Sequence, residues 1–315
     1  MADGCGSDGI YAMMAVDDAA TPLYSEYDSS SACFPLLAEG SSLIQKIAHV
    51  NTAGLNGEVD EDVEQTREGF KMVEGDISLA LTPATIQEFM PRITGMAWNG
   101  SSKTWPVKTM PGYWHTIIHK DAKVFPYEDI QINGFTLSSS AGEITKFILS
   151  CMGKRRTALQ DTWPSGLIPS IVTPYMHADA VVSVGGTAYK TRSFTLSHQK
   201  NLGPRHFDSN EPCGFKRNGK TTTTLQLVVP NTATNLADLL AGAVPPAYLS
   251  VSIVFSHPDT DMSATVELPG WQIPPQDPTV NSGEILLTLD GTCRRTPGEA
   301  GARVPAMTWT NDATT

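Results

Sequence analysis

The pattern of hydrophobic and polar positions between residues 74 and 95 predicts a strand followed directly by a short helix. Apolar residues alternate with small or polar ones over residues 76–81, which is the period of a strand with one buried face. Thr82 can cap a helix, and Pro83 suits its first position, where no backbone donor is lost. An apolar stripe with helical spacing follows, and Gly95 ends it. The predicted core positions of this unit are Ile77, Leu79, Leu81, Ile86, Phe89 and Met90.

The same pattern recurs over residues 221–243. An alternating apolar run is followed by a residue that can cap a helix, Asn231 or Thr232, then by a second apolar stripe and by Gly242. Leu225 takes the place of Ile77 in this second unit. Its predicted core positions are Leu225, Leu227, Val229, Leu236, Leu239 and Leu240.

A further echo follows each unit. In the first half, a Gly-Phe pair at 134–135 leads to Gly-Glu-Ile at 142–144 and a strand-like run. In the second half, Gly-Trp at 270–271 leads to Gly-Glu-Ile at 283–285 and a similar run. We interpret the shared order as a tandem duplication, the alternative being that a β-rich chain offers such pairs by chance.

These patterns predict a mainly β, or α+β, fold. We expect two tandem β-sandwich or barrel domains, each with one short helix packed on its sheet. The expected organisation is an N-terminal arm at 1–30, a first domain at 31–153, a connector at 154–179, a second domain at 180–293 and a C-terminal tail at 294–315.

Composition and charge narrow the class of protein. With 40% hydrophobic and 17% charged residues the chain is globular, and no apolar run is long enough to cross a membrane. The net charge of −11 makes it a poor candidate for gripping nucleic acid, because binding phosphate depends on lysine and arginine. The five cysteines have no metal-ligand spacing, so free thiols in a reducing cytoplasm are expected.

Three short motifs match known sites without their structural context. Residues 214–221 match the phosphate-binding loop, but a β-branched, alternating run follows where a helix is needed, so we expect a basic hairpin tip; a nucleotide-binding enzyme using this loop is the alternative. Residues 4–9 match the dinucleotide fingerprint without a preceding strand. His115 and His119 have helical spacing in a sequence that does not favour a helix. We therefore predict no catalytic, cofactor or metal site.

Two charge clusters of opposite sign lie in different halves of the chain. They are either two solvated loops or complementary contacts between subunits or between rings. The candidate contact residues are Glu58, Asp60, Glu61, Asp62 and Glu64 in the acidic cluster, and Lys216, Arg217 and Lys220 in the basic one.

The segments GDISLALTPATIQEFMPRITG and AGEITKFILSCMGK, with a Gly-aromatic strand between them, resemble the tail tube, or major tail, proteins of long-tailed bacteriophages. The resemblance covers most of residues 32–293. It implies tail tube domains in a structural protein of the virion, not an enzyme, that forms stacked rings with itself and needs no cofactor. DNA would pass through the lumen without specific binding, and no membrane is involved.

By the same resemblance, the further partners are the tape measure protein, the tail terminator and baseplate proteins. The protein would be made in the bacterial host cytoplasm and reside in the virion tail. Combined with the duplication, the resemblance implies that three chains form a pseudo-hexameric ring. The alternative is another β-rich ring or tube component, such as a baseplate or secretion-tube-like protein, which would differ in whether it forms long tubes.

Overall fold

The protein folds mainly as antiparallel β-structure. The computed structural model describes residues 13–17, 27–28, 31–37, 40–51, 66–95, 103–106, 112–120, 123–230, 248–259, 262–274, 286–297, 303–304 and 307–312. Within these ranges there is one α-helix, α1, which confirms the predicted mainly β class. None of the described helices is long and apolar enough to cross a membrane.

The chain is divided into strands as follows. The first half contains β1 (Met13–Asp17), β2 (Ala32–Pro35), β3 (Ile44–Asn51), β4 (Thr66–Ala80), α1 (Pro83–Thr94), β5 (Lys103–Pro106), β6 (Trp114–Lys120), β7 (Lys123–Ser140), β8 (Lys146–Gly153) and β9 (Arg155–Arg156). The second half contains β10 (Ala180–Val184), β11 (Thr187–Tyr189), β12 (Ser193–Gln199), β13 (Leu202–Arg205), β14 (Gly214–Arg217), β15 (Thr222–Pro230), β16 (Leu249–Ser256), β17 (Ser263–Gln272), β18 (Leu286–Cys293), β19 (Thr296–Pro297), β20 (Arg303–Val304) and β21 (Thr308–Asp312).

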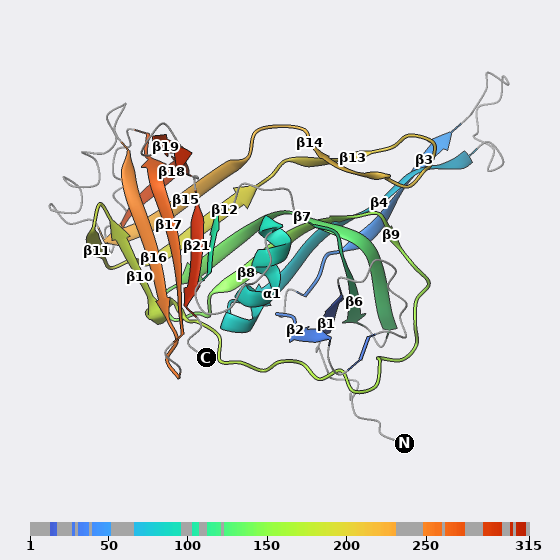
Figure 1. The fold of residues 1–315 in the computed structure, drawn as a ribbon, viewed down its shortest axis with the longest axis horizontal. Helices are drawn as coiled ribbons and strands as arrows, with labels where there is room; N and C mark the ends of the chain where they lie inside the picture. The colour runs from blue at the N-terminus through green and yellow to red at the C-terminus, as the bar shows by residue number, and fades with distance from the viewer. Residues whose placement is uncertain are drawn as a thin grey trace.

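One sheet runs through both halves of the chain. Its strands follow the order β4–β8–β7–β12–β15–β18, and each neighbouring pair is antiparallel. The halves meet where β7 pairs with β12, with Leu137 opposite Leu196. Gly134 permits the close approach there, because a Cβ at this position would lie 2.3 Å from the His198 carbonyl oxygen. We name this six-stranded arrangement the shared sheet (Figure 1).

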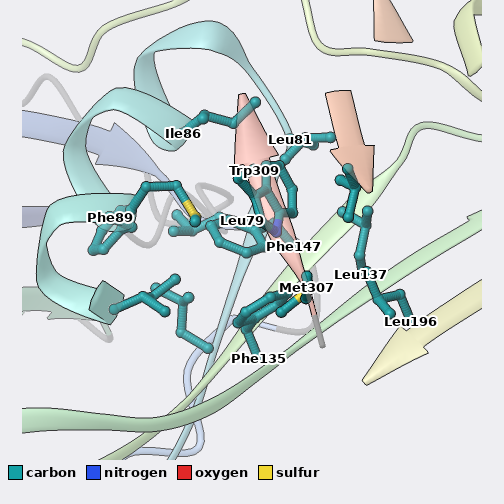
Figure 2. Close-up of a cluster of buried hydrophobic side chains, with 14 of the residues drawn as sticks. Leu79, Leu81, Ile86, Phe89, Phe135, Leu137, Phe147, Leu196, Met307 and Trp309 are labelled. Carbon is teal, nitrogen blue, oxygen red and sulfur yellow. The ribbon is translucent and has the colours of Figure 1, made fainter. Parts of the chain in front are cut away.

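The hydrophobic core lies on one face of the shared sheet. Alternating residues of each strand point into it, as the period of a β-strand requires. Figure 2 shows part of this core, in which α1 packs over strands of the first half. Of the residues proposed as the core of the repeated unit, nine lie in described segments and are buried, namely Ile77, Leu79, Leu81, Ile86, Phe89, Met90, Leu225, Leu227 and Val229.

Local signals explain where α1 begins and ends. Thr82 and Thr85 form a reciprocal capping box, since the amide of each donates to the other's hydroxyl at 2.9 and 3.0 Å. Gly95 ends the helix in the left-handed region, with φ of 71°. The expected second helix, with Leu236, Leu239 and Leu240, lies outside the described residues.

A second layer completes each half. In the second half, β11–β10–β16–β17 faces the shared sheet, and the rings of Phe194 and Phe255 lie 6.1 Å apart across the core. In the first half, a small sheet of β2–β1–β6 joins the early part of β7. Strands β16 and β17 of this layer pair as an antiparallel hairpin.

Part of the segment expected as an N-terminal arm belongs to the fold. Residues 13–17 form β1, which pairs with β2 on one side and with β6 on the other. Met14, Ala15 and Val16 are buried, because Met14 and Val16 pack in the main core on one face of β1 and Ala15 packs in a smaller apolar cluster on the other. The prediction of an arm over residues 1–30 is therefore wrong for residues 13–17, which form a strand of the fold.

The segment expected as a loose C-terminal tail also contains a core strand. Residues 308–312 form β21, which lies between β17 and β5. The Trp309 side chain is fully buried, and its ring lies 6.0 Å from Phe135 and 6.4 Å from Phe147 (Figure 2). The expectation of a loose tail is wrong here, because this side chain fills a cavity among residues of the first half.

Replacing Trp309 with alanine should lower the free energy of unfolding by about 3–5 kcal/mol, because a buried indole is lost and its cavity remains. Urea denaturation of the variant measures this loss. Thr308→Ala, on the same strand and half-buried, is the matched control and should change stability by about 0.5 kcal/mol or less. Equal midpoints for the two variants would contradict the assignment of Trp309 to the core.

Candidate assembly surfaces

The face of the shared sheet opposite the core is lined by hydroxyl groups. The same alternation that buries one set of side chains turns serines and threonines of β7, β12, β15 and β18 to the other side. Gln226 Nε2 donates to Asp290 Oδ1 at 2.7 Å, so this carboxylate is hydrogen-bonded across neighbouring strands. The residues of this hydroxyl face include Thr136, Ser138, Thr195, Ser197, Thr224, Gln226, Thr288, Asp290 and Thr292.

The hydroxyl face is hollowed in the second half and carries few charges. A cavity of about 510 Å³, open to solvent, is lined there by residues of β12, β15 and β18, including Thr195, Gln226 and Asp290. In the first half, Lys146 on β8 and Asp76 on β4 lie in the same phase of alternation as the hydroxyls. The described residues that the six strands themselves turn to this side include no cluster of cations, so these strands offer little positive charge to a polyanion.

Two of the three residues of the basic cluster lie on a strand rather than at a hairpin tip. Strands β13 and β14 form a two-stranded ribbon in which Leu202 lies opposite Arg217 and Arg205 opposite Gly214. Lys216 is exposed on β14, Arg217 is half-buried, and Lys220 is exposed in the turn before β15. The tip of the ribbon is residues 206–213, so the predicted place of the cations was wrong.

Residues 214–221 also lack the geometry of a phosphate-binding loop. Gly214–Arg217 is strand β14, and Thr222 opens strand β15. A phosphate loop needs the amides of a helix N-terminus after it. Since a strand follows instead, the motif match has no structural counterpart.

The β13–β14 ribbon reaches back over the first half of the chain. At its tip, the Lys71 amide donates to the Asn210 carbonyl at 2.7 Å, and Asn210 Nδ2 donates to the Glu68 carbonyl at 3.1 Å. Near its base, Leu202 and Phe215 pack with Met152 in a small apolar cluster. The ribbon is therefore a built contact between the halves and not a freely solvated loop.

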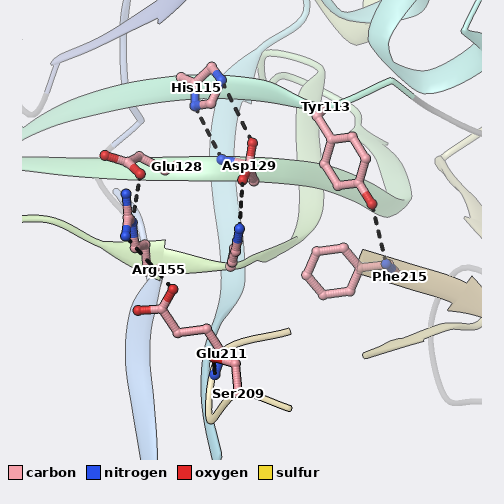
Figure 3. Close-up of polar contacts among 9 residues, drawn as sticks. Tyr113, His115, Glu128, Asp129, Arg155, Ser209, Glu211 and Phe215 are labelled. Carbon is pink, nitrogen blue, oxygen red and sulfur yellow. Dashed lines mark hydrogen bonds and ion pairs between the residues drawn. The ribbon is translucent and has the colours of Figure 1, made fainter. Parts of the chain in front are cut away.

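A polar network strengthens this contact (Figure 3). Arg155 Nε donates to Glu128 Oε2 at 2.7 Å, and its Nη1 lies 3.8 Å from Glu211 Oε2 of the ribbon. The Phe215 amide donates to Tyr113 Oη at 3.4 Å. The hydrogen bond to Glu128 is the main cause that raises the pKa of Arg155. The connector's first cations are thus engaged within the chain.

The two histidines with helical spacing lie on strand β6. His115 Nδ1 accepts a hydrogen bond from the Asp129 amide at 3.2 Å, which holds the bend of β7 (Figure 3). The His119 ring packs edge-on against Trp163 at 5.7 Å. No group of three or more metal-ligating side chains occurs in the described part of the chain.

Three cationic or titratable side chains gather where β12 ends. Lys200 is fully buried, and its Nζ donates to the carbonyl of Ile93 in the last turn of α1. Burial, with a smaller contribution from Arg217, lowers the pKa of Lys200 to about 7. Burial, with the charges of Lys200 and Arg217, lowers the pKa of His198 to about 3, so this imidazole is neutral.

Sequence reasoning missed Lys200, although a signal was present. Phe194, Leu196 and His198 alternate into the core, and Lys200 continues the same phase.

The acidic cluster, Glu58 to Glu64, lies outside the described residues. It falls between Asn51 and Thr66, which form the last described pair of the β3–β4 hairpin.

Lys200 should make stability depend on pH. Its folded pKa lies below the unfolded value of 10.5, so the folded state is penalised as pH falls from about 10.5 to about 7, and the penalty is constant below that. Relative to Lys200→Met, the wild type should therefore gain on the order of 4 kcal/mol between pH 7 and pH 10.

Denaturant melts at several pH values measure this difference. The slope of stability against pH carries the result, since losing the hydrogen bond to Ile93 shifts the Met variant by a constant. Lys216→Met is the matched control for an exposed lysine and should run parallel to the wild type. A Lys200→Met curve that also runs parallel to that of the wild type would contradict the lowered pKa of Lys200.

A family model described as phage tail tube protein matches residues 53–293, which include the shared sheet and the ribbon. A search of curated proteins found no match.

Proposed function

This chain belongs to the phage tail tube protein family, and we propose that its shared sheet forms a segment of the tube wall. The protein is a structural component of the virion tail that assembles with itself into a tube. The observation that carries the proposal is the shared sheet itself: six strands from both halves, with a packed core on one face and hydroxyl groups on the other.

The hydroxyl face is proposed to line the lumen. Serine and threonine keep such a surface wetted, while the scarcity of cations denies DNA the counterion release that drives binding to a protein. DNA would then slide along the wall without specific contacts. The apolar core on the opposite face is covered by α1 and the second layer. The hydroxyl face is open to solvent along β12, β15 and β18, whereas the ribbon covers it at Met152 in the first half.

Open strand edges support joining of sheets between copies. Along Leu286–Thr292, β18 pairs with β15 on one side, whereas its pairs with β17 are confined to Cys293 and Thr292. At the far end of the sheet, β3 pairs only with β4 among the described strands. Unpaired edges are templates for further pairing, and closing the sheet around a ring would satisfy them.

We further propose that three chains form a pseudo-hexameric ring. The register of the two halves supports it, because Ile77 pairs with Leu149 and Leu225, the counterpart of Ile77, pairs with Gly291. Cys151 follows Leu149 by two residues, and Cys293, its counterpart, follows Gly291 by two residues. The correspondence between the halves is less close at β17. Phe135 pairs with Leu149 in the first half, whereas Trp271, its counterpart, pairs with Cys293, which is two residues after the position equivalent to Leu149.

The charge clusters are proposed as contacts between copies. Arg217 has no carboxylate partner among the described residues, and Lys216 and Lys220 are exposed nearby. The acidic segment with Glu58, Asp60, Glu61, Asp62 and Glu64 from another copy would supply the missing negative charge. Pairing of this kind would fix the register between subunits or rings.

The wider setting is proposed from family membership. A tape measure protein would occupy the lumen during assembly, and tail terminator and baseplate proteins would contact the ends of the tube. Synthesis would take place in the bacterial host cytoplasm, before incorporation in the virion. We propose no catalytic role and no cofactor for this chain.

Purified protein at rising concentration should form hollow tubes or stacked rings in negative-stain electron microscopy. Symmetry-free averages should show rings with three chains and six similar lobes, because each chain supplies two related units. Mass photometry of single rings, read in multiples of the chain mass, checks the count. Rings of six chains would overturn the trimer while leaving the tube role intact, whereas persistent monomers at every concentration would count against self-assembly.

Reversing the basic cluster should abolish assembly. Lys216→Glu, Arg217→Glu and Lys220→Glu together would oppose the acidic segment of the neighbouring copy with like charge. Restoring opposite signs by changing the five acidic residues to lysine in the same chain should recover tubes. Assembly yield by sedimentation measures both effects, and a triple variant that assembles as the wild type does would remove the proposed pairing.

A further inference from the structure

One arrangement of strands occurs twice along the sheet. Strand β3 extends the shared sheet beyond β4, so the first half contributes β3–β4–β8–β7 and the second half continues with β12–β15–β18. Every neighbouring pair is antiparallel, and the steps from β3 to β12 are β3–β4, β4–β8, β8–β7 and β7–β12. An even number of antiparallel steps makes β3 parallel to β12, and likewise β4 to β15. The β3–β4 and β12–β15 hairpins therefore leave the sheet at the same end, and the ribbon is the extension of the second hairpin.

The ribbon leaves its own half and is seated on the other. Its Leu202 and Phe215 pack with Met152 of β8. Farther out, its His206 ring lies 4.1 Å from the ring of Phe70 on β4. The hairpin of one unit thus lies across the neighbouring unit, on the side toward β3.

The β3–β4 hairpin has no such seat within its own chain. Figure 1 shows β3 and β4 at the end of the molecule away from β16 and β17. Among the described strands, β3 pairs only with β4, so no further unit of the same chain lies beyond it in the sheet. If this hairpin follows the same direction as the ribbon, it reaches the second half of a neighbouring copy.

The surface that corresponds to the ribbon's seat is basic in the second half. The equivalent pairs of β4–β8 and β15–β18 align the two halves, and on this alignment Lys220 takes the place of Met72. Arg294 takes the place of Met152 in the same way. Both cations are exposed and continue the phase of alternation that faces the hydroxyl side, and the adjoining Arg295 is also exposed. We name Lys220, Arg294 and Arg295 the basic seat.

The β3–β4 hairpin carries the opposite charge. Asn51 and Thr66 are its last described pair, and the sequence between them, TAGLNGEVDEDVEQ, has five carboxylates and no basic residue. The first-half seat offers methionines to a ribbon that brings Leu202 and Phe215, whereas the basic seat offers cations to an acidic hairpin. Each hairpin therefore matches the seat that lies ahead of it, and complementary charge would select the second contact over wrong ones.

We propose that the β3–β4 hairpin of one copy docks on the basic seat of the next copy in the same ring, as the ribbon docks on the first half of its own chain. This inference rests on the proposed tube function and makes the pairing of the charge clusters a lateral contact. The step from one half to the other inside the chain would then be repeated between chains. A head-to-tail contact whose rotation closes gives a ring.

The ribbon also indicates which positions meet between copies. Counted along β3 and β12 from their equivalent pairs with β4 and β15, Asn51 is the counterpart of His206. On the same alignment, Asn218 is the counterpart of Phe70. Because His206 and Phe70 are in contact within the chain, Asn51 of one copy should lie beside Asn218 of the next.

Cysteine cross-linking tests this juxtaposition. In a background with Cys5→Ser and Cys213→Ser, chains that carry Asn51→Cys and Asn218→Cys are assembled and mildly oxidised. Neighbouring chains should become linked by a disulfide. Asn51→Cys combined with Val181→Cys is the matched control, since Val181 is exposed on β10 of the second layer, and it should give little linked product.

The size of the linked product distinguishes a contact within a ring from a contact between rings. On a non-reducing denaturing gel, a lateral contact gives a ladder that stops at the number of chains in one ring, as counted by mass photometry. A ladder that continues beyond this number would overturn the proposal. Normal tubes without linked product would also overturn it and leave the tube function standing, whereas a wild type that forms neither rings nor tubes would overturn both.

Reversing one cation of the basic seat should weaken ring formation. Arg294→Glu should raise the concentration at which rings form by about 10-fold, because it opposes the acidic hairpin with like charge. Lys190→Glu is the matched control: this lysine is exposed before β12 and outside the basic seat, and its reversal changes the net charge equally. Thermal melts that match the wild type establish that both variants are folded, and equal shifts for the two would contradict the basic seat.

Discussion

The geometry of the whole molecule depends on the continuous hydrogen bonding of β7. This 18-residue strand pairs first with β6 and β9, and then with β8 on one side and β12 on the other. The bend between its parts is marked by Asp129, a residue other than glycine in the left-handed region, with φ of 51°. Because every backbone donor in a sheet needs its partner, the position of one half fixes that of the other.

The two halves are consequently not separate packing units. Phe135 and Phe147 of the first half pack against Trp309 from the C-terminal end of the chain, and Lys200 of the second half reaches the carbonyl end of α1. The ribbon adds a third tie through Asn210 and Glu68. Two halves that share strands, core and polar contacts form one building block, which suits a protein whose role is to hold a fixed shape in a tube.

How much of this could be predicted depended on the range of the interactions. The strand before α1, its Thr82 cap and its Gly95 end are local signals, so the sequence revealed them. The strands at Met13–Asp17 and Thr308–Asp312 are only five residues long, and their pairing partners lie far away in the chain. Nothing local distinguishes them from loops. The same holds for the ribbon. Its cations were expected at a solvated tip, because its docking on Glu68 and Lys71 is a long-range contact. Lys200, by contrast, could have been found from the alternation of residues along its strand.

The position of β21 also constrains how the chain is made. Residues 308–312 leave the ribosome after every other described strand, yet Trp309 completes a core built from residues that emerged long before. The first half must wait, with Phe135 and Phe147 incompletely covered, until this late strand arrives. A chain interrupted before residue 308 would thus lack Trp309 and a finished core.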